Sequence, residues 1–483
     1  MNRALLAAAA ASLALAGCAN LAPEHEAPAL PVPPTFDETL RPDGSVVASQ
    51  LSYREWFLDP RLDALIAMAL DNNRDLVAAT ARIEQARARY RIEDSRRLPS
   101  VVADGSAVRT RQPITGALAA QVPADGETAV ADAITYNALD VGVGISSFEL
   151  DFWNRLGNLR EAARARYLAT IAAQRAFYLS LIADVATTYF EIVETEEQIA
   201  LAEATAESRR EALRIAQLRL DAGVTSALPY RQAETLLTQA EQQLASERLS
   251  LALLRNQLAV LVGGAVPENL PASLELTAQG DERRLAAGLP SDLLLARPDI
   301  VQAEALLEAA RADIGAARAA FFPSISLTGR TGLASDDLGG LLGTDGLGWS
   351  FGPSISLPIF DWGAREANLD LARAVEVEEV ANYDRTVQGA FREVADSLAG
   401  RRWLAEQIET LERAVAAQER IARIARLRYR EGVADYLEVL DAERNLFSAQ
   451  QQLLATRRAW LQNRATLFVA LGGGFDQPNA EPR

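Results

Sequence analysis

The feature that most constrains this chain is a long segment that occurs twice, at constant spacing and without gaps. The stretch LRLDAGVTSALPYRQAETLLTQAEQQL begins at Leu218 and LRYREGVADYLEVLDAERNLFSAQQQL begins at Leu427, an offset of 427 − 218 = 209 residues. Trp153 and Trp362 keep the same spacing. A gapless match fixes the lengths of elements as well as their residue types, so it indicates two structurally equivalent halves.

Composition narrows the class of protein. Hydrophobic residues make up 49% of the 483 but aromatic residues only 6%, which is typical of long Ala- and Leu-rich helices. The net charge is −17 with no basic run, which disfavours nucleic acid as a partner. His25 and Cys18 are the only residues of their types, so we expect no intrachain disulfide, no metal cluster, no cofactor and no enzymatic activity.

The N-terminus resembles an export signal. Arg3 precedes an apolar run from Ala4 to Ala16 that is too short to span a bilayer, and LAGC ends at Cys18. The segment is either a plain signal peptide with an incidental cysteine or a bacterial lipoprotein signal, and the lipobox-like LAGC favours the second. That resemblance implies removal of residues 1–17 and acylation of Cys18. Ala19 is consistent with sorting to the outer membrane. Each buried CH₂ of an acyl chain contributes about 0.8 kcal/mol to anchoring.

The first half of the mature chain begins with a Pro-rich tether, 18–58, and its repeat unit covers 59–262. Apolar spacing predicts a helix from Asp59-Pro60 to Leu98-Pro99, then a strand over 100–111, a loop over 112–131 and a second strand from Tyr136. A Pro-free helix over 156–220 would be roughly 100 Å long at 1.5 Å per residue. A turn at Gly223 and a return helix over 229–262 follow.

The second half, 297–471, repeats this plan after a mixed segment, 263–296, and before a C-terminal tail, 472–483. Its predicted elements are a helix over 298–322, a strand over 324–332, a Gly-rich loop over 335–348, a strand over 349–360, a helix over 363–429, a turn at Gly432 and a helix over 436–471.

Each half thus contributes two strands with one apolar face, as in the alternation of Trp349, Phe351, Pro353, Ile355, Leu357 and Ile359. Four strands cannot close a barrel, and an open edge in lipid leaves backbone groups unpaired. Either further copies of the chain complete a membrane barrel, or the strands form a small soluble sheet. The long helices must pack along their length, and their many alanines suit close packing against two neighbours.

Several motifs together make the chain resemble the TolC-type family of outer-membrane efflux proteins, in the lipoprotein branch that serves tripartite drug pumps. Besides Cys18 and the doubled halves, they are ELDFWNRLG from Glu149, RPDI from Arg297, FFPSISLTG from Phe321, PIFDWG from Pro358 and RYREGVADYLEVLDAERNLF from Arg428. The resemblance covers nearly the whole mature chain. It is carried by the order and spacing of the motifs, since no single one is decisive.

The resemblance implies a mainly α-helical fold with a membrane β-barrel. Three chains with four strands each would form a 12-stranded barrel in the outer membrane, continuous with a long helical tunnel across the periplasm. An equatorial band would form around residues 263–296 and the C-terminal tail. The implied partners are two further copies of the chain, outer-membrane lipid, a periplasmic adaptor and an inner-membrane pump of the RND type. The implied function is a passive exit duct for small molecules.

The resemblance also places both helical turns at the periplasmic tip, where the family meets the hairpin of its adaptor. The expected docking residues are Gly223, Val224, Thr225 and Ser226 in the first turn and Gly432, Val433, Ala434 and Asp435 in the second. The alternative is that the glycines only end the helices.

After the second turn, Glu438, Asp441 and Arg444 are spaced i, i+3, i+6 and share one helix face. Their first-half equivalents, at 209 residues less, are Pro229, Gln232 and Thr235, so the fold itself does not need these charges. The resemblance implies a periplasmic gate here, where carboxylates from three chains would approach the axis. The alternative is a solvated helix face.

Two other functions stay open. One is a duct of the same family that serves one-step protein secretion. The other is a lipid-anchored periplasmic coiled-coil protein that acts as an adaptor or spacer, with a soluble sheet.

Overall fold

The computed structural model describes residues 20–24, 31–33, 36, 46–47, 52–113, 133–279, 285–286 and 297–473. The signal peptide, Cys18, residues 114–131 of the predicted loop and the tail beyond residue 473 lie outside these described residues. The chain divides into two compact units. Unit 1 comprises Met1–Ala27, Gln85–Tyr167 and Ala305–Val380, and unit 2 comprises Pro28–Glu84, Leu168–Glu304 and Ala381–Arg483.

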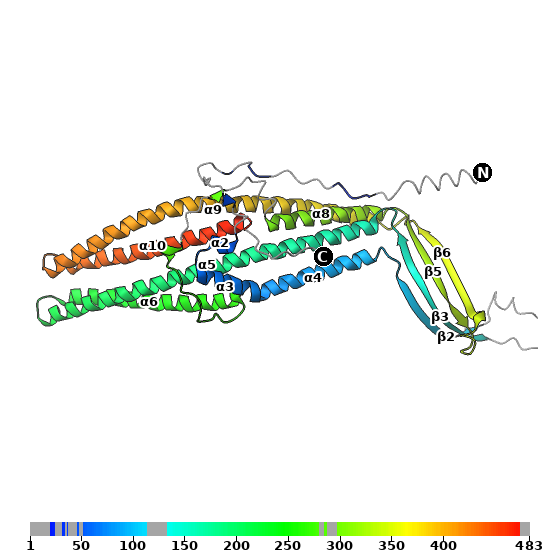
Figure 1. The fold of residues 1–483 in the computed structure, drawn as a ribbon, viewed down its shortest axis with the longest axis horizontal. Helices are drawn as coiled ribbons and strands as arrows, with labels where there is room; N and C mark the ends of the chain where they lie inside the picture. The colour runs from blue at the N-terminus through cyan, green and yellow to red at the C-terminus, as the bar shows by residue number, and fades with distance from the viewer. Residues whose placement is uncertain are drawn as a thin grey trace, which may run out of the picture. The chain divides into compact units, whose positions relative to one another are not determined.

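The repeat is reproduced in the helices. α5 (Arg155–Asp221) and α9 (Ala364–Arg430) both have 67 residues, and their starts are 364 − 155 = 209 residues apart. The return helices α6 (Ala227–Val262) and α10 (Tyr436–Ala470) have 36 and 35 residues. Figure 1 shows each long helix followed by its shorter partner. All four helices lie within two residues of the bounds that the sequence pattern predicts.

The helices before the strands differ from the prediction. The single helix expected from residue 59 to 98 is two helices, α3 (Pro60–Asn72) and α4 (Arg74–Ser95), preceded by the short α2 (Tyr53–Trp56). The chain breaks at Asn73 because its side chain accepts hydrogen bonds from the N–H groups of Asp75 and Leu76, both at 2.9 Å. Its amide also donates to the carbonyl of Leu261 at 2.8 Å.

The second half has a matching helix, α8 (Pro298–Ala319), of the same 22 residues as α4. Its offset from α4 is 298 − 74 = 224 residues, against 209 for the long helices. The first half is therefore 224 − 209 = 15 residues longer between its short and long helices, a stretch that contains its pair of strands.

Four antiparallel strands form one sheet in the order β2 (Val101–Pro113), β3 (Ala133–Leu150), β5 (Ser324–Ser335) and β6 (Leu347–Ser356). β2 and β6 are the edge strands in the sheet of Figure 1. The strand bounds differ from the prediction in several places, and β2 and β6 are also displaced by one or two residues at Pro113 and Leu347. β3 begins at Ala133 because it follows its partner to Pro113, and β5 continues to Ser335. β6 ends at Ser356, shortly before Pro358, which has no N–H to donate.

The two faces of the sheet differ in chemistry. Directly opposed residues lie on the same face, so one face carries the apolar row Phe351–Gly329–Ile145–Val101 and its neighbours. Several of its side chains are strongly exposed in the single chain: Val101, Val141, Val143, Leu347, Trp349, Phe351 and Ile355. This confirms the predicted separation of apolar and polar residues between faces.

The opposite face is mostly small and polar, and its exposed apolar exceptions are Val102, Val108, Ile134 and Tyr136. Arg330 on β5 pairs there with Asp104 on β2, at 2.7 Å, and with Asp140 on β3. Glycines on β3 make room for it: a Cβ at Gly142 would lie 2.9 Å from the Nε of Arg330. One cation thus ties three strands together across their polar face.

Within unit 1, alanine and glycine let helices approach closely. Ala162 and Ala165 of α5 form a buried cluster with Ala309 and Ala312 of α8. A Cβ at Gly315 would have only 2.4 Å to the side-chain nitrogen of Asn158 and could not be accommodated without movement. The predicted close packing of small residues is found at this contact.

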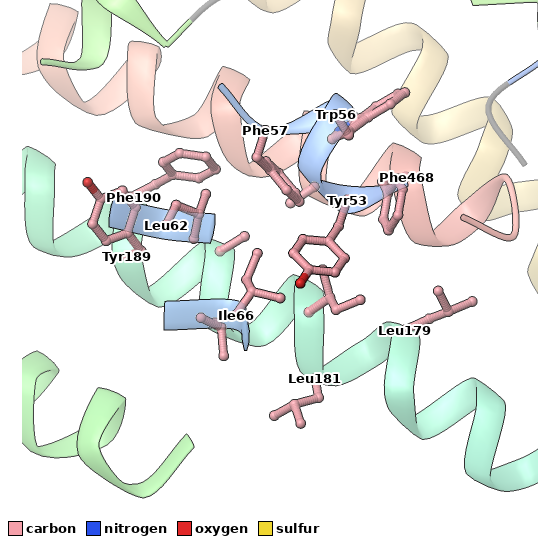
Figure 2. Close-up of a cluster of buried hydrophobic side chains, with 14 of the residues drawn as sticks. Tyr53, Trp56, Phe57, Leu62, Ile66, Leu179, Leu181, Tyr189, Phe190 and Phe468 are labelled. Atoms are coloured by element: carbon pink, nitrogen blue, oxygen red, sulfur yellow. The ribbon is translucent and has the colours of Figure 1, made fainter. Parts of the chain in front are cut away.

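Unit 2 contains the main apolar core. Figure 2 shows aromatic and aliphatic side chains from α2, α3, α5 and α10 converging on one cluster. The Phe468 ring centroid lies 5.5 Å from that of Trp56 and 6.0 Å from that of Phe57. These contacts hold the start of the first half against the end of the second.

Asp59 joins this core to the segment after α6. One carboxylate oxygen caps α3 by accepting the N–H of Arg61 at 2.8 Å. The other accepts the hydroxyl of Tyr189 at 2.6 Å and the N–H of Leu274 at 3.0 Å. Asp59 is 1% exposed, so all three bonds are shielded from water. β1 (Val46–Val47) pairs in parallel with β4 (Leu285–Ala286).

Asp59→Ala should destabilise the protein by about 2–4 kcal/mol, because it removes a helix cap and leaves a buried hydroxyl and a buried N–H unpaired. Thermal unfolding of the detergent-purified protein measures this as a lower midpoint. Asp71→Ala, at an exposed position of the same helix, is the matched control and should change little. Equal midpoints for the two variants would contradict the assigned role of Asp59.

Candidate functional site

Both helical hairpins turn in the same way. Gly223 and Gly432 have φ of 67° and 74°, the left-handed region in which glycine is favoured. The N–H of Val224 donates to the carbonyl of Arg219 at 3.0 Å, and the equivalent bond from Val433 to Arg428 is 2.9 Å. This is the Schellman pattern, which satisfies the last carbonyls of a helix. The predicted turns at these two glycines are confirmed.

The tips expose matched apolar side chains. Val224 is 66% exposed and Val433 is 69% exposed, on the two turns. Leu228 and Leu437, again 209 residues apart, are 63% and 60% exposed on the helices that follow. The leucines were missed in the sequence analysis, although applying the repeat offset to exposed turn-flanking positions would have found them.

The remaining predicted tip residues are at the surface or partly covered. Thr225 and Ala434 are half-buried, whereas Ser226 and Asp435 are exposed. Ser226 caps α6 by accepting the N–H of Leu228 at 3.4 Å. Asp435 occupies the same position before α10 but makes no side-chain capping bond. Its carboxylate is therefore not engaged by its own helix.

The two tips pack against each other inside unit 2. A buried cluster combines Ala216 and Ala233 of the first hairpin with Ala422, Ala425, Tyr436, Val439 and Ala442 of the second. The guanidinium carbon of Arg219 lies 4.8 Å from the centre of the Tyr429 ring, and this ring meets Tyr436 edge-on at 5.1 Å. Burial raises the pKa of Tyr436 to about 12, so its hydroxyl keeps its proton at neutral pH.

The three predicted gate residues lie on one exposed stretch of α10. Glu438 pairs with Arg428 of α9, with 3.1 Å between carboxylate oxygen and guanidinium nitrogen. Asp441 accepts a hydrogen bond from the side chain of Asn445 at 3.2 Å. Arg444 is exposed, and among the described residues it makes no ion pair. The structure thus places the three on one face, with Glu438 tied across the turn.

The first hairpin lacks this arrangement. Arg219, the equivalent of Arg428, stacks on Tyr429 instead, because the position equivalent to Glu438 is Pro229. Thr235, equivalent to Arg444, donates its hydroxyl to the carbonyl of Arg231 in its own helix. The charges at the second tip are therefore an addition to a shared scaffold.

Within the part of the chain that the structure describes, no group of three His, Cys, Asp or Glu side chains is arranged to hold a metal ion. Cys18, the predicted lipidation site, lies outside that part.

Comparison with known proteins agrees with this architecture. The family model for outer membrane efflux protein matches residues 65–264 and 289–473, one segment in each half of the repeat. The chain belongs to the outer membrane efflux protein family. The two matched segments end at Gly264 and Gly473, beside the positive-φ glycines that follow the return helices.

Members of the family with assigned roles are similar over almost their whole length. The cation efflux system protein CusC of Escherichia coli K12 is 39% identical over 468 residues, covering 96% of this chain and 98% of CusC. The toluene efflux pump outer membrane protein TtgI of Pseudomonas putida is 40% identical over 472 residues, covering 96% of this chain and 97% of TtgI.

Solved structures of outer-membrane channels share the fold. The open state of the Neisseria gonorrhoeae MtrE channel matches with a TM-score of 0.83 at 37% identity, over 94% of this chain and 98% of MtrE. The Campylobacter jejuni CmeC channel matches with a TM-score of 0.85 at 26% identity, over 95% of this chain and 96% of CmeC. The exposed apolar face of the sheet therefore belongs to a membrane protein.

Proposed function

We propose that this family member is the outer-membrane exit duct of a tripartite efflux pump, which conducts small molecules passively from the periplasm-spanning complex to the exterior. One observation carries the proposal: the same chain contains an open four-stranded sheet and two hairpins built on 67-residue helices. The sheet is mainly apolar on one face and mainly polar on the other. A polar face suits a water-filled passage, and an apolar face suits lipid.

The unpaired edges of β2 and β6 support assembly from three copies. Lipid offers no hydrogen bonds, so each edge must pair with another strand, and β6 of one copy pairing with β2 of the next closes a barrel. Three chains with four strands each give the 12 strands expected from the sequence.

The two repeated tryptophans support the same closure. Trp153 stacks on Phe322 at 4.6 Å between ring centres and donates its indole N–H to the carbonyl of Pro323 at 2.9 Å. Trp362, 209 residues later, is 90% exposed. The residues that follow the short helices α4 and α8 are 224 positions apart, so the first-half equivalents of Phe322 and Pro323 are Leu98 and Pro99. The side chain of Leu98 is 69% exposed. In the assembly, Leu98 and Pro99 of the next copy would cover Trp362.

The partners follow from the family. The relatives named above are components of cation and toluene efflux systems, which favours small-molecule export over protein secretion and over a purely structural coiled coil. We assign the chain a periplasmic adaptor and an inner-membrane RND-type pump as partners, two further copies of itself, and no catalytic role or cofactor. The pump supplies the energy.

Lipidation of Cys18 would add an anchor beside the barrel. The lipobox-like LAGC supports it, and mass spectrometry of the mature N-terminus tests it directly. An unmodified N-terminus at any other residue would remove the anchor from the proposal.

We place the gate at Glu438, Asp441 and Arg444 and the adaptor contact at the two turns. The exposed carboxylates support the gate because three copies would bring six of them near one axis, where bound cations and nearby arginines balance their repulsion. The matched exposed valines and leucines support the adaptor contact, since one type of adaptor hairpin would find the same apolar surface twice.

Closure between copies can be tested by chemical crosslinking. Leu98→Cys combined with Trp362→Cys, in a Cys18→Ser background, should give covalent dimers and trimers with a short bis-maleimide. The control pair is Leu98→Cys with Trp349→Cys, since Trp349 is similarly exposed but lies near the start of β6, at the other end of that strand from Trp362. Denaturing gels measure the products. Only monomers from the first pair, or equal crosslinking by both pairs, would refute the assigned contact.

Removal of the gate carboxylates should open the duct. Glu438→Ala with Asp441→Ala should raise single-channel conductance in planar bilayers severalfold, because the acidic ring and the Arg428 ion pair are lost. Gln232→Ala, at the position equivalent to Asp441 in the first half, should leave it unchanged. If conductance stays at the wild-type level in the double variant, these residues do not form the gate.

The tip leucines should contribute to adaptor affinity. Leu228→Ser or Leu437→Ser should each weaken binding to the cognate adaptor about tenfold, as expected for ~1.5 kcal/mol of apolar burial per leucine. Leu249→Ser, at an equally exposed position of α6 away from the turn, is the control. Surface plasmon resonance gives the dissociation constants, and unchanged values for both tip variants would exclude an apolar tip contact.

A further inference from the structure

A small cavity of about 180 Å³ lies in unit 2 between the two hairpins, near their tips. The first hairpin contributes Arg209 and Leu236 to its lining, and the second contributes Tyr429, Arg430 and Glu443. The gate residues of α10 are not part of this lining. The cavity is therefore a separate feature of the contact between hairpins.

Arg209 is a buried cation without an acidic partner. It is 5% exposed, and among the described residues no carboxylate lies within ion-pair distance of it. One terminal nitrogen donates to the carbonyl of Leu236 at 2.7 Å, and the guanidinium carbon lies 5.2 Å from the centre of the Phe447 ring. Its buried Nε has no hydrogen-bond partner. Burial lowers the pKa of Arg209, a sign of how poorly the charge is compensated.

The other polar groups of the cavity leave positive charge in excess. Glu443 forms an ion pair with Arg426 at 3.1 Å, although its buried Oε1 accepts no hydrogen bond, and its charge partly offsets the effect of burial on the pKa of Arg209. Glu211, at the rim, is held by Arg214 through two short hydrogen bonds of 2.6 and 2.7 Å. Arg430 is exposed and makes no ion pair within the described residues.

The cavity also contains a hydrogen-bonding group without a partner. The hydroxyl oxygen of Tyr429 is buried and has no hydrogen-bond partner. Such a hydroxyl can donate to an anion. Buried polar groups are rarely left unpaired, and those that are call for a ligand or water.

We propose that this cavity binds a small free oxyanion, a carboxylate or a phosphate, through the guanidinium of Arg209, with Arg430 and the hydroxyl of Tyr429 as further ligands. Arginine binds such anions in a planar, two-pronged manner, and the cavity volume suits an anion of a few heavy atoms. The bound charge supplies the counter-ion that the protein does not give to Arg209.

An anion in this place contacts both hairpins at once. Arg209 extends from α5 to the backbone of α6 and to an aromatic ring of α10, while Tyr429 and Arg430 belong to α9. Occupancy would therefore hold the two hairpins in their present arrangement. Resting on the proposed duct function, this makes the anion an effector that favours the present arrangement of the tip.

The site is present once per chain. The position equivalent to Arg209 in the second half, 209 + 209 = 418, is Gln418. The equivalent position of the other long helix is uncharged, so the repeated fold does not require an arginine there.

The binding experiment uses the full-length protein in detergent. Isothermal titration calorimetry with inorganic phosphate and with acetate, against chloride at matched ionic strength, should give one site per chain. Arg209→Met should weaken binding tenfold or more, and Arg430→Gln, an exposed position whose change spares the fold, should weaken it severalfold. Arg210→Met, one residue along the same helix and paired with Glu207 at the surface, is the control and should bind as the wild type does.

Two outcomes would overturn the site: no binding of either anion, or equal weakening by Arg209→Met and Arg210→Met, which would indicate general charge attraction. Single-channel recording then tests the effect on the tip, where saturating anion should shift the open fraction of the wild type but not of Arg209→Met. Binding with unchanged channel activity overturns the effector role. Binding by a protein that never conducts overturns the proposed duct and leaves the site standing.

Discussion

A strand at the edge of a sheet must find a partner if lipid surrounds it, and the rest of this molecule follows from that requirement. The four strands of one chain leave two edges open, so a single chain cannot be complete in an outer membrane. The doubled sequence fits this requirement, because the open edges β2 and β6 belong to two equivalent strand pairs. Two copies can therefore join at β6 and β2 as β3 and β5 join within one chain. The contact of Trp153 within the chain shows how one such junction is packed.

The repeat supplies the scaffold, whereas the differences between its halves supply the specific chemistry. The turns, the glycine conformations and the exposed valines are the same in both hairpins. Charge is distributed differently: Glu438 stands where the first half has Pro229, and Arg209 stands where the second half has Gln418. Both differences lie close to the tips, the part of the family fold in which opening is expected.

The sequence predicted the long helices well because their signal is local: a Pro-free apolar period ends at a glycine that must adopt positive φ. It failed where a distant contact decides. Asn73 interrupts a good helical pattern because its amide finds a carbonyl on α6, which no local period reveals. The length of β3 depends on its partner β2 in the same way. For the candidate site, the turns and the charged face could be located, but the buried state of Arg209 could not, because it depends on which helices approach it.

The arginine on the polar side of the sheet has one more consequence. Since Gly142 has no side chain, the Arg330 side chain lies along the strand surface, where it forms ion pairs with Asp104 and Asp140. Each cluster has two carboxylates for one guanidinium and thus a formal charge of −1, so three copies would carry three fixed, weakly acidic clusters flush with the inner wall while the bore keeps its width. Cationic cargo would meet a wettable lining that attracts it weakly, and anionic cargo one that repels it weakly.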